Sequence, residues 1–484
     1  MFGYFQDDFQ VSPNLTLNLG LRYEFATPQY ERDNRLSNFE PATNTVVLAS
    51  DGSLADRATV DPDYNNFAPR LGFAWKAADR IVLRGGYGMS YVHFNRLGGE
   101  NILSLNPPQV FNVTIDQVAT NPLCTGNNFS GCFRPTMIGY PTGMLDPGQF
   151  NALRSRVNYT PRDNKTANVQ SFHLSVQWEI MKNLLIDAGY VGNRTKDLII
   201  LGDINQARPN NAGESLSIQA RRPRSNFSFI QGSLGIGEAQ YDSFQLKVER
   251  RFSDGLYLLN SLTLSQAYDN AAGHLESSNG DNSRANFNNL AGEWGRSSYD
   301  VPFNNTTSVV YDLPFGRGRH WGSGIPRWLD AIVGGFRMTL INRITSGRPV
   351  NLTYSPSAAF SVSGDITYRP NVIGNVYNED WRETGRYFNI AAVAAPTDVT
   401  QPFGDAPRNG FRGPRFWQAD LGLHKQFVLW NDNTKLELRA EAFNLFNRTN
   451  FNAPNGSIAN TANFGTFTST LPAREIQLAA KLYF

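Results

Sequence analysis

The sequence has no run of about 18 apolar residues, the shortest length that crosses a bilayer as a helix. This absence excludes a helical membrane protein. It leaves a membrane β-barrel open, because every second side chain of a barrel strand is polar and hydropathy does not detect such strands. The 484 residues suffice for several soluble domains or one large barrel. The net charge of +2 gives no indication of a nucleic-acid partner, and we expect none.

Residues suited to catalysis or metal binding are sparse and scattered. The five histidines form neither an HExxH pair nor a His/Cys cluster, and no GxSxG elbow occurs. Gly235 and Gly237 lack the third glycine of a dinucleotide-binding loop, so they indicate a bend instead. We therefore expect no enzyme activity, no cofactor and no metal site. A hydrolase on a barrel rim stays open as an alternative, with His274 as its candidate residue.

There are only two cysteines, Cys124 and Cys132, in the segment CTGNNFSGC. Two cysteines are too few for a zinc site without histidines. Their short spacing around Gly and Asn suits a local disulfide across a loop tip, a bond that oxidising compartments favour. Two free thiols are the alternative.

The most informative feature present is the final segment, residues 476–484 (IQLAAKLYF). Apolar side chains alternate with other residues up to a terminal aromatic, and they are Ile476, Leu478, Ala480, Leu482 and Phe484. This pattern is typical of the closing strand of an outer-membrane barrel. An edge strand of a soluble sandwich is the alternative, although a bare apolar edge invites aggregation.

Other segments repeat the alternation, notably residues 15–25, 172–180 and 435–442. Their apolar positions predict the lipid side, and they include Leu17, Leu19, Leu21, Leu174, Val176, Leu438 and Ala440. The apolar faces begin or end in aromatics, as interfacial girdles require. The opposite faces mix acids and bases, as a wet lumen allows. A one-sided soluble sheet would alternate too, but it would not need such girdles.

Strands come in pairs joined by short turns, and long polar stretches separate the pairs. Short turns on one rim and long loops on the other are typical of outer-membrane barrels. The alternation predicts 13 strands, near 2–11, 15–26, 66–76, 81–93, 169–180, 184–192, 239–252, 256–268, 304–313, 334–346, 415–428, 434–446 and 474–484. The predicted long loops are 27–64, 94–167, 193–237, 269–303, 347–414 and 447–473, with a strand extension at 224–235. Among the turns, 314–332 is long, with a short helix near 328–332, and a tight turn falls at 430–433.

Several motifs resemble TonB-dependent receptors of the Oar-like subgroup, which carry a carboxypeptidase-regulatory-like domain and a plug before the barrel. The motifs span nearly the whole chain and include FQDDFQVSPNLTLNLGLRYEFATP (5–28), DAGYVGNRTKDL (187–198), NGFRGPRFWQADLGLHKQF (409–427) and LRAEAFNLFNRTNF (438–451). The resemblance implies an all-β transmembrane antiparallel barrel of 22 strands, of which residues 1–484 would supply the C-terminal 13. An odd strand count and the lack of a signal peptide agree with this expectation, with plug, TonB box and export signal lying upstream.

The resemblance further implies a receptor in the bacterial outer membrane that takes up a large or scarce solute such as an oligosaccharide, peptide or metal chelate. The implied partners are membrane lipid, the barrel-assembly machinery, TonB and an extracellular solute. By resemblance, the assembly machinery would recognise the final strand. Loop aromatics are the candidate solute contacts, namely Trp294, Trp381, Tyr387 and Phe388. The alternatives are that these rings only pack loop against loop, and that the barrel is an adhesin or passive pore.

We predict that Cys124 and Cys132 are joined in protein isolated from the cell envelope, because their loop would face an oxidising compartment. Mass spectrometry of peptides prepared without reductant should find one linked peptide. Two alkylated free thiols in the same preparation would contradict the disulfide.

Overall fold

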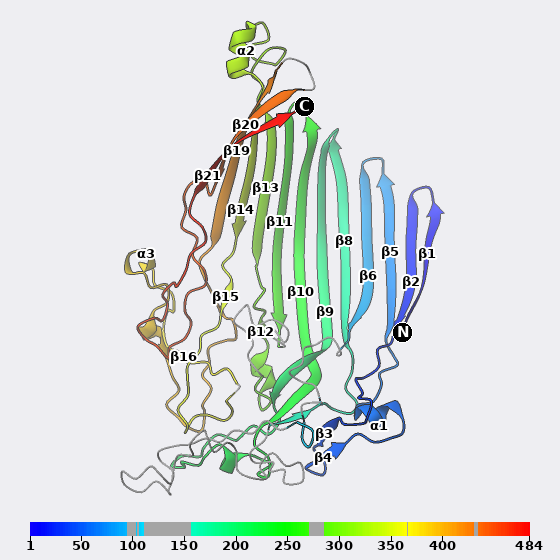
Figure 1. Cartoon of the computed structure of the whole chain (residues 1–484), viewed down its shortest axis with the longest axis vertical. Helices are drawn as coiled ribbons and strands as arrows, with labels where there is room; N and C mark the ends of the chain where they lie inside the picture. Colours follow the sequence, from blue (N-terminus) through cyan, green and yellow to red (C-terminus); the bar gives the residue numbers. More distant parts are fainter. Residues whose placement is uncertain (94–102, 104–105, 111–155, 271–284, 365, 430–433) are drawn as a thin grey trace.

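A computed structural model of the chain describes residues 1–93, 103, 106–110, 156–270, 285–364, 366–429 and 434–484. Fifteen strands form one sheet, and thirteen of them run antiparallel in chain order, with β1 and β21 at its two edges. These thirteen strands are β1 Phe2–Ser12, β2 Leu15–Glu24, β5 Phe67–Ala78, β6 Ile81–Val92, β8 Ala167–Met181, β9 Leu184–Asp203, β10 Ile230–Ser253, β11 Leu256–Asp269, β13 Phe303–Asp312, β14 Phe336–Thr345, β19 Phe416–Val428, β20 Lys435–Phe443 and β21 Glu475–Tyr483. Figure 1 shows these strands side by side, with the long connections gathered at one end.

All thirteen predicted strands are confirmed, each near its expected position. One prediction about the loops is wrong: residues 193–203 and 230–237 belong to β9 and β10, which extend beyond their neighbours. The expected extension therefore exists but begins at Ile230. Two register shifts around Gly237 interrupt the β9–β10 ladder, and bulges of this kind bend and twist a strand pair. The glycines hid the extension because they break the alternating pattern.

The short turns lie at the end of the sheet where Figure 1 places α2, Arg327–Val333. Asn183 and Asp254 adopt positive φ values of 67° and 51°, a conformation that Asn, Asp and Gly tolerate best. The predicted helix in the 314–332 turn is confirmed by α2. The turn predicted at 430–433 lies outside the described residues. None of the helices in the described ranges is long and apolar enough to cross a membrane.

Strand register places the apolar side chains of the sheet on one common face. Leu19 pairs with Leu71, Leu71 with Tyr87, and Tyr87 with Phe172, two residues before Leu174. The same face reaches Ala440 and Leu478 at the far edge. Many of these side chains are exposed, because no protein element covers them. On the opposite face the amide of Asn18 donates to Asp8 at 2.6 Å, and Tyr483 donates to Glu437 at 3.0 Å.

The long connections form a layer of short elements beyond the sheet. They comprise β3 Ser37–Glu40, β4 Thr45–Leu48, α1 Leu54–Ala58, β7 Val157–Tyr159, β12 Gly295–Arg296, β15 Pro349–Val350, β16 Asn371–Val372, α3 Trp381–Thr384, β17 Val393–Ala394, β18 Phe411–Arg412 and the 3₁₀ turns Gln219–Arg221, Leu290–Glu293 and Ile390–Ala392. Two of them continue the sheet into this layer, since β7 pairs parallel with β10 and β12 pairs antiparallel with β11. The three clusters of buried apolar residues all lie at this end, around Phe388, Tyr354 and Phe39. The loops are therefore packed against one another rather than draped over the sheet.

Buried ion pairs stabilise the loop layer, both within one connection and between connections. The carboxylate of Asp203 accepts from Arg222 at 2.6 Å, and both side chains are almost fully buried. Ser363 donates to the same carboxylate at 3.3 Å. Arg369 lies 3.1 Å from Glu293 in a second buried pair. Charges removed from water must be paired in this way, so these contacts fix how the loops meet.

Placing arginine at Leu19 should destabilise the membrane-inserted state by about 2–4 kcal/mol, because a charge on the lipid face near the midplane is costly. Arginine at the neighbouring Asn18 should cost little, since that side chain points to the polar face beside Asp8. A refolding titration in lipid bilayers measures both. Equal losses at the two positions would show that the faces are wrongly assigned.

Replacing Arg222 with alanine should lower the free energy of unfolding of the loop layer by about 3–5 kcal/mol, because the charge of Asp203 would remain buried without its partner. Hydrogen exchange should rise in residues 204–229 and around Ser363 while the sheet stays protected. Arg208→Ala is the matched control, since its pair with Glu214 at 2.8 Å is exposed and should matter little. Equal exchange in both variants would contradict a stabilising role for the buried pair.

Candidate functional site

Four aromatic side chains from three separate loop segments meet in the loop layer. Trp381 begins α3, and its ring centroid lies 5.2 Å from Tyr387, 5.6 Å from Phe451 and 5.5 Å from Phe467. Phe451 and Phe467 are 4.4 Å apart. Edge-to-face contacts dominate, as the quadrupoles of aromatic rings prefer. These residues line a cavity of about 680 Å³, which we call the aromatic pocket.

Local backbone geometry brings these rings together. Gly385 ends α3 with φ 71°, a value that favours glycine, and the chain then turns back so that Tyr387 lies beside Trp381. An isolated bridge between Arg386 and Thr466 holds the last loop against this segment, and a second one between Phe451 and Thr470 joins two parts of the last loop itself. Burial raises the pKa of Tyr387, so its hydroxyl stays protonated near neutral pH.

Arginines supply the charge of the aromatic pocket. Arg382, Arg415 and Arg448 line it, and none of the acidic residues in the described ranges does. The guanidinium of Arg382 lies 4.9 Å from the Trp381 ring centroid, and that of Arg448 lies 5.4 Å from the Trp417 ring. Stacked guanidinium groups keep their donors available at their edges. The pocket can therefore hold an anion next to a flat or apolar group.

A second cavity of about 820 Å³ adjoins the first, and the two share Pro414 and Phe451. Its walls include Arg343 of β14 and Gln418 of β19, both on the polar face of the sheet. We call it the wall pocket. Asn304 also lines it, and within the described residues its buried carbonyl oxygen has no hydrogen-bond partner. An unpaired buried oxygen of this kind suits a water molecule or a bound donor.

The four predicted contact residues lie in three different environments. Trp381 and Tyr387 lie together in the aromatic pocket. Trp294 lies elsewhere, stacked on Tyr268 at 6.4 Å. Phe388 is fully buried in the loop core, so it packs and presents nothing to a solute. Sequence reasoning missed Phe451, Phe467 and the arginines, because only the tertiary packing of distant loops brings them to Trp381.

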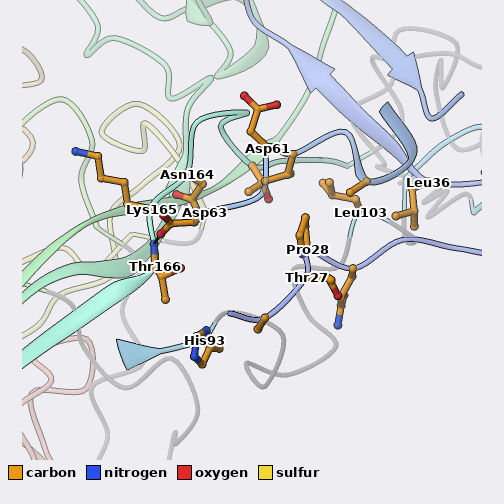
Figure 2. Close-up of a pocket in the computed structure, with 15 residues that line it drawn as sticks. Thr27, Pro28, Leu36, Asp61, Asp63, His93, Leu103, Asn164, Lys165 and Thr166 are labelled. Carbon is orange, nitrogen blue, oxygen red and sulfur yellow. Dashed lines mark hydrogen bonds between the residues drawn. The ribbon is translucent and has the colours of Figure 1, made fainter. Parts of the chain in front are cut away.

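Figure 2 shows a smaller cavity near the loop end of β1, β2, β5 and β6. Its volume is about 80 Å³, enough for only a handful of water molecules. The carboxylate of Asp63 accepts from the backbone N–H of Thr166 at 2.9 Å, while His93 lies apart from them and contacts Glu24 at 3.1 Å. These polar groups are already paired within the protein, so this cavity is a poor site for a large solute.

Other candidate residues stay untested. Cys124, Cys132 and His274 lie outside the described residues. In the described ranges, no three His, Cys, Asp or Glu side chains gather as a metal site would require. The candidate assembly signal lies on the edge strand β21, where Leu478 and Ile476 are exposed, and it ends at the exposed Phe484. Its recognition by the assembly machinery stays a prediction.

The sequence matches the family model described as "Outer membrane beta barrel domain" over residues 1–477. The chain belongs to this family. It is therefore a protein of the bacterial outer membrane, its sheet is the wall of a barrel, and its family is not one of enzymes. The apolar face faces lipid and the opposite face lines the lumen. A search of curated proteins found no match.

Solved structures with a similar fold include outer-membrane receptors and transporters. The siderophore receptor PiuA of Acinetobacter baumannii is 10% identical with a TM-score of 0.44, and the match covers 100% of this chain and 42% of that one. The outer membrane transporter YddB of Escherichia coli is 13% identical with a TM-score of 0.47, and the match covers 100% of this chain and 45% of that one. The ferric enterobactin receptor PfeA of Pseudomonas aeruginosa is 12% identical with a TM-score of 0.47, and the match covers 100% of this chain and 44% of that one. The chain thus spans less than half the length of each.

Proposed function

We propose that this chain is the barrel portion of a TonB-dependent transporter of the Oar-like kind, which takes up a solute too large or too scarce for porins. The observation that carries the proposal is the pair of adjoining pockets. One lies among the extracellular loops and the other against the lumen side of β14 and β19. A solute held by the loops would thus meet polar groups of the barrel wall next.

The chemistry of the pockets favours an anionic solute with flat or apolar parts. Three arginines and four aromatic rings line the aromatic pocket, and its volume of about 680 Å³ falls within the usual range for ligand sites. Arg343 and Arg348 add positive charge to the wall pocket, and they outnumber its one carboxylate among the described residues, Glu475. Among oligosaccharides, peptides and metal chelates, an acidic peptide or an anionic chelate fits these groups best. A neutral oligosaccharide would leave the arginines without a counter-charge.

The partners follow from this function. TonB would supply the energy for uptake from the inner membrane. The assembly machinery would pair with β21, because an edge strand with free backbone groups can add a strand in trans. The packed loop layer suits capture of a solute at the surface, and it would equally serve an adhesin, which is the second candidate function.

The test is a binding and uptake assay in cells that express the chain from its own gene. Acidic peptides, anionic chelates and neutral oligosaccharides of matched size, each with a fluorescent label, serve as probes. We expect an anionic probe to bind and then accumulate in the periplasm, and an uncoupler to abolish accumulation but not binding. Binding without accumulation would favour the adhesin, and accumulation that the uncoupler leaves intact would favour a passive pore.

Trp381→Ala should weaken binding of that anionic probe by roughly 5- to 30-fold, because stacking on an aromatic platform of this kind contributes on the order of 1–2 kcal/mol. Trp294→Ala is the matched control, since this tryptophan is also partly exposed but lies away from the aromatic pocket. The dissociation constants from fluorescence titration of whole cells measure both. Equal loss in the two variants would exclude the aromatic pocket as the binding site.

A further inference from the structure

Four polar side chains interrupt the apolar, lipid-facing side of the sheet on three neighbouring strands. Asn260 of β11 pairs across to Thr307 of β13, and Thr307 pairs across to Asn342 of β14. Asn305 lies two residues before Thr307 and therefore points to the same face. We call these four residues the asparagine cluster.

The asparagine cluster lies within the apolar band and not at its border. Asn260 stands between Leu258 and Leu262 on its own face of β11. On the same face of β13, Asn305 and Thr307 lie between Phe303 and Tyr311, which are aromatic residues near the two ends of the strand. Aromatic girdles mark the membrane interfaces of a barrel, so the positions between them face the hydrocarbon. Polar groups there are costly and usually serve a purpose.

Three members of the cluster bond to one another. The amide nitrogen of Asn260 donates to Thr307 at 2.8 Å and to Asn305 at 3.3 Å. Asn305 donates back to the carbonyl oxygen of Asn260 at 3.3 Å, and the Thr307 hydroxyl donates to Asn305 at 3.4 Å. These bonds use both N–H groups of Asn260 but only one of the two on Asn305.

Asn342 completes the cluster but is only half satisfied. Its carbonyl oxygen accepts from the indole nitrogen of Trp417 at 2.8 Å. Within the described part of the chain, its amide nitrogen donates to nothing. An amide carries two N–H donors, and lipid tails offer no acceptor. With the spare N–H of Asn305, the cluster therefore presents donors toward the membrane that only another polar surface can pair.

We propose that the asparagine cluster is a contact between two copies of this chain inside the outer membrane. Two copies inserted in the same direction are related by an axis along the membrane normal, which keeps every residue at its own depth. With that axis beside β13, the cluster of one copy meets the cluster of the other at the same depth. Amide side chains both donate and accept, so the surface is complementary to itself, and it holds no charge that would demand an oppositely charged partner.

Cysteine cross-linking in cells tests the contact directly. Thr307→Cys is placed in a chain whose Cys124 and Cys132 are both serine, expressed from its own gene in the outer membrane. Leu174→Cys in the same background is the control, since Leu174 lies on the same apolar face but on β8, away from the cluster. After mild oxidation, a dimer that reductant removes should form from Thr307→Cys and not from Leu174→Cys.

Three outcomes of this experiment would overturn the proposal: no dimer from either variant, equal dimer from both, or an adduct of Thr307→Cys with a different protein. A second variant separates a contact from a cluster that merely satisfies itself. Asn342→Leu, added to Thr307→Cys, should lower the dimer yield at least tenfold. Asn18→Leu, which removes an amide from the lumen face, should leave it unchanged. An unchanged yield with Asn342→Leu would show that the amide plays no part between copies.

Discussion

Every backbone N–H and C=O inside the bilayer must find its partner within the protein, because hydrocarbon offers none. The thirteen-strand ladder meets this demand strand by strand, with each interior strand bonded on both sides. The other features of the membrane part follow from it. Strands must be long enough to cross, side chains must alternate between lipid and lumen, and irregular chain must leave the membrane before it can turn. Short turns therefore gather at one end and the long connections at the other.

Beyond the membrane the same chain folds by different rules. The strands that cross the bilayer hold almost no shared apolar core, since lipid takes that role on one face and the lumen is polar. The loop layer stands in water and has to build its own cores, and all three buried apolar clusters lie there. Buried pairs such as Arg369 with Glu293 then fix the relative placement of loops. That rigidity is what allows Trp381 and Phe451, seventy residues apart, to form one pocket.

The sequence predicts most of the membrane part, because a period of two is visible in single strands such as residues 15–25. It fails where that pattern is absent. The glycines at 232, 235 and 237 hid the first third of β10, although they are part of the strand. In β13 both faces are polar near Phe303, so alternation located the strand but could not reveal that Asn305 faces lipid. The loop aromatics predict solute contacts even less well. Phe388 and Tyr387 are neighbours in sequence, and only the packing of the loops decides which of them is buried.

The polarity of β13 on both faces links the two sites. Asn304 points to the wall pocket with an unpaired oxygen, while its neighbour Asn305 points the opposite way into the asparagine cluster. Successive side chains of a strand cannot share a face, so one polar stretch serves the lumen and the lipid side in turn. Apolar side chains on the lipid side of β13 would have avoided the free-energy cost of placing polar groups in the membrane. A strand that is apolar only on its lipid side could still line the wall pocket through Asn304, so solute contact does not explain Asn305 and Thr307. Their presence requires a separate cause on the lipid side, and contact with a second copy supplies one.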